Sequence, residues 1–263
     1  AVKHFTSKGH ILLYVERWLK CPVQKQDGTI QQRTKGTPQG GVISPVLANI
    51  FLHFAFDCWF ERKHPECRFE RYADDIIIHC NNFKEALRVL DSVTQRMNQC
   101  KLELKRGKNN IVYCRRKNPR SIRFKPKYSS FDFLGFTFKP RMVKTKRGIW
   151  LLAFAPGISR KSQRKIGQTL FKMKIHRMVH LQLSDIAQLL ADKLRGWLYY
   201  YGRFRMSELR HVLRVLNVRL THWVRNKYRR FWRKHRFFAF KWLQEVSRKY
   251  PVMFVHWRAG FLP

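Results

Sequence analysis

The sequence contains few acidic residues, no long apolar run and no closely spaced cysteine pair. Among its 263 residues are 55 Lys and Arg but only 16 Asp and Glu, a formal net charge of +39. No run reaches the roughly 18 apolar residues of a transmembrane span, and the N-terminus lacks the apolar core of a signal peptide. The sequence therefore predicts an intracellular protein. Its location would be the cytoplasm if its source is bacterial, and an organelle is the alternative location.

The six cysteines, at positions 21, 58, 67, 80, 100 and 114, include no C-x-x-C pair. Scattered cysteines are typical of reduced thiols in the core of an intracellular protein. The histidines show no metal-ligand spacing with them. A zinc site is therefore not predicted.

Hydrophobic residues make up 44% of the chain and aromatic residues 14%, which is enough for a packed core. A surface with so large an excess of positive charge binds polyanions by releasing their counterions. Nucleic acid is the most direct partner. A membrane surface fits less well, because the apolar residues are not confined to one basic amphipathic helix.

The charge is unevenly distributed along the chain. Residues 139–263 hold 30 Lys and Arg against 4 Asp and Glu, whereas the first 138 residues hold 25 against 12. The apolar pattern changes over the same region from mixed α/β to helical. We therefore place a domain boundary around Gly157.

The first part is predicted to alternate helices with short strands. Apolar residues at helical spacing predict helices over 8–20, 44–63 and 82–100. Alternating or β-branched runs predict a hairpin over 23–35 and strands over 69–72, 76–80, 102–104, 111–113, 131–138 and 149–154. Ser44 is the predicted N-cap of the second helix. The predicted buried stripes are Leu47, Phe51, Phe54 and Cys58 in that helix, and Leu87, Leu90, Val93, Met97 and Cys100 in the next.

The second part is predicted to be helical. Helices are expected over 159–178, 184–204, 207–232 and 238–249, the second opening with Ser184 as its cap. Their apolar stripes fit a helical bundle. Aromatic residues on these stripes, such as Trp197, Tyr201 and Trp223, are interpreted as core. The fold class is therefore α+β.

Asp74 and Asp75 stand between two short predicted strands. Asp is a poor strand former, and adjacent like charges repel. One interpretation is a solvated turn, the more common origin of such a pair. The other is a set of Mg²⁺ ligands, since Mg²⁺ prefers carboxylate oxygens together with substrate phosphates. These two residues alone leave both interpretations open.

Residues 36–45 form a loop rich in glycine and proline that leads into a helix. Such a loop allows a phosphate to approach the helix N-terminus, where the helix dipole favours it. Loops of this kind are also common without any ligand, so this segment alone is weak evidence for a phosphate-binding site.

Several segments in a fixed order resemble a known family. TPQGGVISP (37–45) and YADD (72–75) resemble the palm of a reverse transcriptase, and FDFLGF (131–136) resembles the strand that grips the primer end. LRGWLYYYG (194–202) resembles the thumb, or maturase, segment of group II intron-encoded reverse transcriptases, as do AFKWL (239–243) and HWR (256–258). The resemblance implies a partial palm, an antiparallel sheet with helices, over 1–156 and an all-α thumb and maturase region (domain X) over 157–263.

The resemblance also implies roles for individual residues. Asp74 would ligate catalytic Mg²⁺, or Mn²⁺ in its place, with Asp75 as a less intimate neighbour. Tyr72 and Ala73 would lie beside the primer terminus. The remaining implied contacts are Gln39 and Gly40 with the incoming nucleotide and template, Lys108 with the triphosphate, and Leu134 and Gly135 as the primer grip. Asn109 follows Lys108 where the family more often has threonine.

One departure from the family pattern concerns a further catalytic aspartate. The family places it on a palm strand upstream of the first helix here, after a fingers domain. Glu16 and Asp27 are the upstream acids in this region, and their predicted helix and turn positions make neither a substitute. We expect this N-terminally truncated polypeptide alone to be inactive or very weak unless a second piece supplies the strand.

The resemblance implies an RNA-directed DNA polymerase of a mobile group II intron that also serves as its splicing maturase. The alternative is a catalytically inactive splicing cofactor that binds RNA through the basic helices. Implied partners are the intron RNA, an RNA template, a DNA primer, deoxynucleoside triphosphates and a separate polypeptide carrying the fingers, but no membrane. The predicted RNA contacts are Arg160, Lys161, Arg164, Lys165, Arg203, Arg225, Lys227, Arg229 and Arg230. The alternative interpretation of these residues is a basic face that contacts only solvent.

Overall fold

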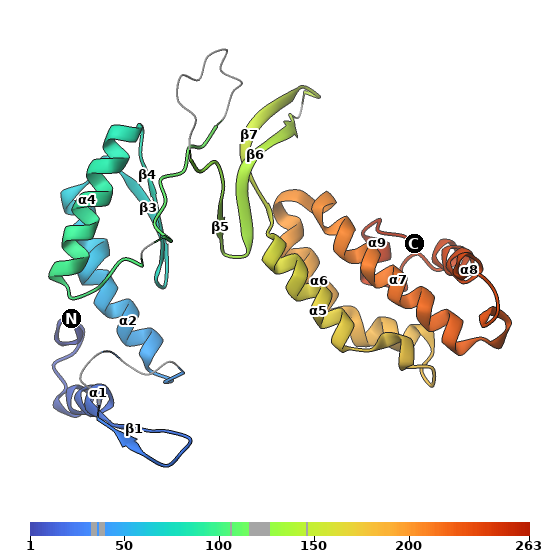
Figure 1. The fold of residues 1–263 in the computed structure, drawn as a ribbon, viewed down its shortest axis with the longest axis horizontal. Helices are drawn as coiled ribbons and strands as arrows, with labels where there is room; N and C mark the ends of the chain where they lie inside the picture. Colours follow the sequence, from blue (N-terminus) through green and yellow to red (C-terminus); the bar gives the residue numbers. More distant parts are fainter. Residues whose placement is uncertain (33–35, 37–39, 106, 116–126, 146) are drawn as a thin grey trace. The chain divides into compact units, whose positions relative to one another are not determined.

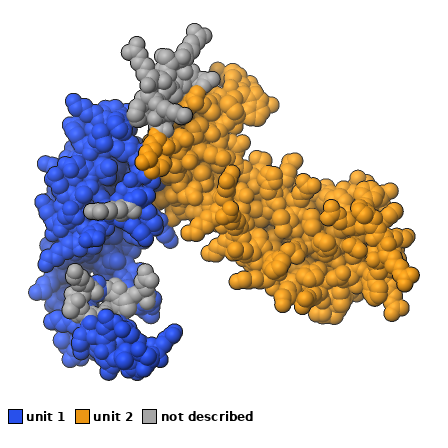
Figure 2. All heavy atoms as spheres, in the orientation of Figure 1, with its two compact units in different colours: residues 1–111 blue, residues 112–263 orange. Residues whose placement is uncertain are grey.

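The structure, a computed structural model, describes residues 1–32, 36, 40–105, 107–115, 127–145 and 147–263. It divides into two compact units, unit 1 over residues 1–111 and unit 2 over residues 112–263 (Figure 2). Both combine helices with small antiparallel sheets, which confirms the predicted α+β class. The palm–thumb boundary at residue 157 stays a prediction. None of the helices in these residues is long and apolar enough to cross a membrane.

Unit 1 contains the predicted helices and both predicted hairpins (Figure 1). Its sheets are two separate two-stranded ladders, β1 with β2 and β3 with β4. In chain order its elements are α1 (Gly9–Lys20), β1 (Val23–Gln24), β2 (Ile30–Gln31), α2 (Ser44–Leu52), a π-helical turn (His53–Asp57), α3 (Cys58–Lys63), β3 (Arg68–Tyr72), β4 (Asp75–His79) and α4 (Phe83–Gln99).

The predicted helix over 44–63 forms, but its buried face differs from the prediction. The π-helical turn adds an extra residue to one turn, which rotates every later side chain around the axis. The buried residues from this turn onward are therefore Ala55, Phe56 and Phe60, whereas Phe51, which precedes the turn, is 41% exposed. Ile43, and not Ser44, occupies the N-cap position.

Two further predictions for unit 1 are wrong. In α4, Val89 is buried where Leu87 was expected, and Leu87 is 47% exposed. Residues 102–104 and 111–113 are not strands. Leu102 and Leu104 instead pack directly against the core of the unit, so their alternating pattern arises from burial without a neighbouring strand.

Unit 2 begins with a three-stranded antiparallel sheet in the order β5-β6-β7, followed by packed helices. The four predicted helices all form, and α5, α6 and α7 contribute to one apolar core (Figure 1). Its main elements are β5 (Phe131–Phe133), β6 (Phe136–Lys144), β7 (Trp150–Ile158), α5 (Arg160–Lys172), α6 (Leu183–Arg205), α7 (Arg210–Lys227), α8 (Arg236–Lys249) and α9 (Val255–Arg258).

The single strand predicted over 131–138 is a tight hairpin. Phe131 pairs with Phe138 across the β5–β6 ladder, and Leu134 and Gly135 form the turn with φ of 49° and 79°. Alternation continues on both arms of a hairpin, which is why the sequence pattern conceals the turn. The cap of α6 also differs from the prediction. Gln182, and not Ser184, is the N-cap, and it forms a capping box with Asp185.

The core of unit 2 confirms the apolar stripes predicted for α6 and α7. Leu190, Leu194, Leu216 and Leu220 are fully buried. Trp223 is fully buried as well, and its Nε1–H donates to the carbonyl of Met178 at 2.8 Å. Trp197 and Tyr201 pack at the edge of the same core, as predicted for aromatic residues at helical spacing.

Candidate active site and RNA-binding face

Asp74 lies in the two-residue turn that joins β3 to β4. The strands pair up to Tyr72 with Asp75, which leaves Ala73 and Asp74 as the turn. Ala73 has a φ of 55°, a left-handed conformation that costs a residue with a Cβ atom about 1 kcal/mol. The turn therefore needs contacts from outside the hairpin to hold it.

Arg71 supplies those contacts. Its guanidinium binds both oxygens of Asp57, Nε to Oδ1 at 2.6 Å and Nη2 to Oδ2 at 2.5 Å. Nη1 donates to Asn49 Oδ1 at 2.9 Å and to the carbonyl of Ala73 at 3.1 Å. The hydrogen bonds to Asp57 raise the pKa of Arg71, whose side chain is only 12% exposed. Arg71 thereby ties the turn to α2 and to the π-helical turn.

Side-chain alternation directs the acidic residues away from the core. Phe69 and Arg71 are half-buried on the inner face of the hairpin. Tyr72 and Asp75 are directly opposite each other and exposed, and Asp74 is exposed in the turn. The hairpin therefore presents two adjacent carboxylates to solvent.

The donor chemistry of this turn fits Mg²⁺. It offers hard carboxylate oxygens with open access for water and nucleotide phosphates, the ligands that Mg²⁺ retains in proteins. Across the described residues, no third His, Cys or carboxylate side chain lies close enough to Asp74 and Asp75 to complete a three-ligand group. The pair would thus supply only part of a metal site, and metal binding by Asp74 and Asp75 stays a prediction.

The two upstream acids have local partners. Glu16 pairs with Lys20 at 2.5 Å on the same helix. Asp27 Oδ1 accepts the N–H and the O–H of Thr29, at 3.0 and 2.7 Å, within the β1–β2 turn. Both carboxylates are thus used within their own elements, although the prediction that neither replaces a catalytic aspartate remains untested.

Only some of the residues predicted to contact the nucleotide belong to the described part of the chain. Gln39 lies outside the described residues. Gly40 is exposed with a φ of 93°, shortly before α2 begins. Lys108 is exposed in a turn where its N–H donates to the carbonyl of Lys105 at 3.2 Å. Their roles stay predictions.

The Leu134–Gly135 turn is fixed by the helices of unit 2. The carbonyl of Gly135 accepts the hydroxyl of Ser162 at 3.0 Å and the N–H of Ser159 at 2.9 Å. The hydroxyl of Tyr200 donates to the carbonyl of Leu134 at 2.8 Å. A Cβ atom on Gly135 would lie 2.9 Å from Ser162 Oγ, so glycine is required by the close approach as well as by its φ.

Four predicted RNA contacts gather in the first two turns of α5. Ser159 caps this helix, its Oγ accepting the N–H of Ser162 at 3.1 Å, and no acidic residue lies in the first turn. Cations are unfavourable at a helix N-terminus, whereas a bound anion is stabilised there. The arrangement therefore favours a phosphate, and the exposed cations are Arg160, Lys161, Arg164 and Lys165.

Two predicted contacts near the end of α7 are less exposed. Lys227 Nζ donates to the carbonyls of Val179 and Leu181 at 3.0 and 2.6 Å, so this cation holds a neighbouring loop. Arg225 is half-buried, and its Nε has no hydrogen-bond partner within the described part of the chain. The other candidates, Arg203, Arg229 and Arg230, are exposed. RNA binding by these five residues stays a prediction.

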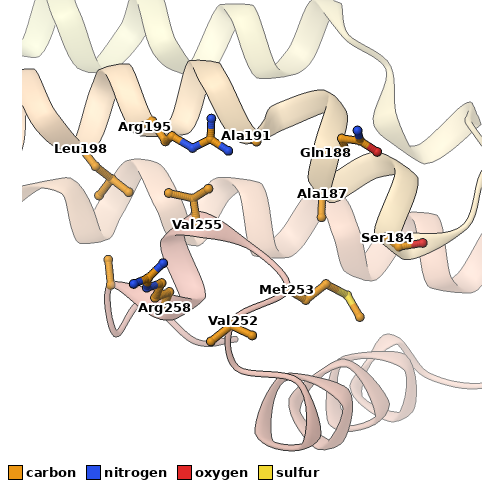
Figure 3. Close-up of a pocket in the computed structure, with 11 residues that line it drawn as sticks. Ser184, Ala187, Gln188, Ala191, Arg195, Leu198, Val252, Met253, Val255 and Arg258 are labelled. Carbon is orange, nitrogen blue, oxygen red and sulfur yellow. The ribbon is translucent and has the colours of Figure 1, made fainter.

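A cavity of about 810 Å³ lies within unit 2, between α6 and residues 252–259. Figure 3 shows Arg195 on α6 and Arg258 on α9 among its lining residues. Arg195 Nη1 also pairs with Asp192 at 2.8 Å. Both arginines stand in segments that carry the family resemblance, 194–202 and 256–258, but no individual role was predicted for either.

Two family models match the chain. The model "Reverse transcriptase (RNA-dependent DNA polymerase)" matches residues 1–138, more than half of the sequence. The model "Group II intron, maturase-specific domain" matches residues 163–240. The chain belongs to the group II intron reverse transcriptases. No curated protein matches it.

Membership confirms the predicted family and function, an RNA-directed DNA polymerase with a maturase role. The alternative, a purely RNA-binding cofactor, is not favoured over it. The sequence patterns did not reveal that Arg71, with Asp57 and Asn49, holds the turn that carries Asp74. Strand alternation from Phe69 places Arg71 on the inner face, and a buried arginine requires a partner; that signal was present in the sequence.

Proposed function

We propose that Asp74 and Asp75 of this group II intron reverse transcriptase hold Mg²⁺, or Mn²⁺, for RNA-templated DNA synthesis. The supporting observation is the turn between β3 and β4, where a left-handed alanine is held by the Arg71 clamp. A positive φ is usual at this position of a two-residue hairpin turn, but glycine, asparagine or aspartate normally occupies it, and here an alanine does. When bound, the metal would stabilise the charge on the phosphates during nucleotidyl transfer.

The chain's own residues would place the substrates around this turn. Tyr72 and Ala73 would lie beside the primer terminus. The rigid Leu134–Gly135 turn would hold the primer backbone, because its two carbonyls are already engaged by helix side chains and backbone. Gln39, Gly40 and Lys108 would contact the incoming deoxynucleoside triphosphate and the template.

The basic helices would bind RNA phosphates. The cluster at the start of α5 gathers four exposed cations within two helical turns, and charge on this scale favours polyanions. The bound RNA would be the intron during splicing and the template during synthesis.

Residues 1–263 would show little or no polymerase activity alone. Asp74 and Asp75 have no third carboxylate nearby among the described residues, and a nucleotidyl-transfer centre with two ions needs further ligands. We propose that a preceding segment, or a separate polypeptide with the fingers, contributes another aspartate.

Primer extension tests this proposal. The 263-residue chain and a version extended upstream by an aspartate-bearing strand are each given an RNA template, a DNA primer, deoxynucleoside triphosphates and Mg²⁺. Only the extended protein should synthesise DNA, and Asp74→Asn should lower its rate about 10³-fold, the order expected when a metal ligand is lost.

The matched control is Asp192→Asn, which removes a carboxylate that is 93% exposed on α6. It should leave the rate unchanged. Full extension activity in Asp74→Asn would refute the assignment of the metal ligand. Strong activity of the unextended chain that depends on Asp74 would refute the need for another aspartate.

A further inference from the structure

A second group of potential metal ligands lies at the other end of the same hairpin. The Sγ atoms of Cys67 and Cys80 and a carboxylate oxygen of Glu85 all lie within 4.8 Å of one another. Cys67 immediately precedes β3, Cys80 immediately follows β4, and Glu85 stands in the first turn of α4. Three separate elements therefore converge on one point.

The strand register explains why the two thiols meet. The β3–β4 ladder ends with Arg68 opposite His79, so Cys67 and Cys80 are the next opposed positions. Both share the inner face with Phe69, and both belong to the core of unit 1. Cys67 is buried and Cys80 half-buried, so an ion bound here would be largely shielded from solvent.

Glu85 is held in place for such a role. Its Oε2 accepts the N–H of Asn81 at 2.5 Å, and its own N–H donates to Asn82 Oδ1 at 2.9 Å in the cap of α4. Glu85 is buried, although buried carboxylates are rare without a compensating partner. Hydrogen bonds from outside the ligand set orient metal ligands and strengthen binding.

The local charge also favours a cation. In the metal-free chain, burial, the neighbouring Cys67 and the carboxylates of Glu85 and Glu66 together raise the pKa of the Cys80 thiol to about 12. The negative field that disfavours a thiolate attracts a divalent cation. Such a negative centre is unusual in a chain with a formal charge of +39.

We propose that Cys67, Cys80 and Glu85 bind one Zn²⁺-class divalent ion. Two sulfurs and a carboxylate oxygen are a ligand set of the type that zinc accepts, with water as the fourth ligand. On binding, each thiol releases its proton to solvent, so the ion, two thiolates and one carboxylate carry a net charge of −1. Arg88, one turn along α4 from Glu85, offsets that charge.

A redox disulfide between the same cysteines fits the structure less well. A disulfide would leave the buried carboxylate of Glu85 outside the bond, with its hydrogen bond to the Asn81 N–H. A metal ion uses all three side chains.

The ion would be structural and distinct from the proposed Mg²⁺ site. Cys67 is seven residues from Asp74 along an extended strand, a separation of about 20 Å. Thiolate ligands select Zn²⁺, whereas the carboxylates of the turn suit Mg²⁺. The ion would join the open end of the hairpin to α4, opposite the end that Arg71 clamps.

Metal titration of the reduced, full-length chain tests the proposal. Co²⁺ and Cd²⁺ are added in the presence of excess Mg²⁺, and binding is followed by the thiolate-to-metal charge-transfer absorption. One ion should bind per chain and raise the unfolding midpoint. Cys67→Ser and Cys80→Ser should abolish the absorption, and Glu85→Gln, which keeps an oxygen for the Asn81 N–H, should weaken binding at least tenfold.

Two controls make the test specific. Cys100→Ser, at another half-buried cysteine of unit 1, and Asp74→Asn should both bind the ion as the wild-type chain does. X-ray absorption of the Cd²⁺-loaded wild-type protein should show two sulfur ligands, which requires no variant to fold. No charge-transfer absorption in the wild type, its persistence in Cys67→Ser, or a sulfur-free coordination shell would overturn the proposal.

Discussion

Unit 1 presents its carboxylates on a hairpin held by polar contacts, whereas unit 2 presents its cations on helices held by an apolar core. The described core of unit 1 contains Phe56, Phe60 and few other buried side chains, and the β3–β4 turn depends on Arg71. The core of unit 2 joins residues from every one of its helices. The proposed catalytic turn therefore depends on single side chains, while the proposed RNA-binding surface depends on bulk packing.

The difference follows from what each site requires. Metal ligands must be placed within a fraction of an ångström, and directional hydrogen bonds to a guanidinium provide that precision. Phosphate contacts by long basic side chains tolerate small displacements, so a well-packed helix suffices. Four experiments would break or sharpen this comparison, ordered from the largest expected effect.

Trp223→Ala should destabilise unit 2 by about 4 kcal/mol, because it removes a fully buried side chain together with its hydrogen bond to the Met178 carbonyl. Urea unfolding followed by circular dichroism measures the change. Trp232→Ala, at a side chain that is 56% exposed, is the control and should cost less than about 1 kcal/mol. Equal losses in the two variants would contradict the dependence of unit 2 on its core.

Arg71→Lys should destabilise unit 1 by about 3 kcal/mol, since lysine cannot reproduce the bidentate bond to Asp57 together with the bonds to Asn49 and Ala73. Urea unfolding of unit 1 gives the value, and primer extension by the extended protein should fall with it.

Arg62→Lys is the matched control for the clamp. Arg62 is exposed and donates only to the carbonyl of Cys58 at 3.0 Å, so its replacement should change stability by less than about 0.5 kcal/mol. An Arg71→Lys protein with wild-type stability and activity would show that the turn does not need the guanidinium.

His256 gives unit 2 a polar, pH-sensitive contact inside its apolar core. Its Nε2–H donates to Asn217 Oδ1 at 2.8 Å, and burial lowers the pKa of His256 to about 3. The folded chain therefore holds a neutral imidazole, whereas the unfolded chain binds a proton below its ordinary pKa of about 6.5. This contribution to stability is complete above pH 6.5 and is lost as the pH falls toward 3.

At pH 5 the loss should be about 2 kcal/mol relative to pH 8. Unfolding free energies of the wild type and His256→Gln at several pH values measure it, and the variant should show a flatter pH profile by that amount. His211→Gln, at an exposed position on α7, should retain the wild-type slope. An identical slope in wild type and His256→Gln would exclude this histidine as the cause.

Charge reversal at the start of α5 should have the smallest effect. Arg164→Glu combined with Lys165→Glu should weaken RNA binding about tenfold and reduce the slope of log affinity against log salt by about 1.5, as expected for two lost phosphate contacts. Filter binding across a salt series measures both quantities. Lys84→Glu, at an exposed cation of α4, should leave the slope nearly unchanged; a loss as large as that of the α5 variant would indicate nonspecific attraction.

Helix positions and the acidic hairpin could be predicted because strong periodicity and local turn chemistry determine them. The predictions that failed have local physical causes. The π-helical turn shifted the buried face from Phe54 and Cys58 to Ala55, Phe56 and Phe60, and continuous alternation concealed the Leu134–Gly135 turn. Neither a bulge in a helix nor a two-residue turn changes the hydrophobic pattern enough to be detected.

The site shows the same limit. Asp74 was visible in the sequence as an unexplained charge between strands, whereas Asp57 looked like any polar helix residue. Its pairing with Arg71 arises only when two elements fold together. Likewise, the spacing of Cys67, Cys80 and Glu85 matches no short metal motif, because strand register and not sequence proximity brings them together.

Metal-directed cleavage of the polypeptide tests most directly whether the β3–β4 turn binds the catalytic metal. Fe²⁺ replaces Mg²⁺ in the extended protein bound to primer, template and nucleotide, and hydroxyl radicals formed at the ion cut the nearby backbone. A Cys67→Ser/Cys80→Ser background removes the proposed thiolate site from the pattern. Cuts should cluster at residues 72–76 and disappear in Asp74→Asn, and persistence of those cuts in Asp74→Asn, or their absence from the parent protein, would contradict the assignment.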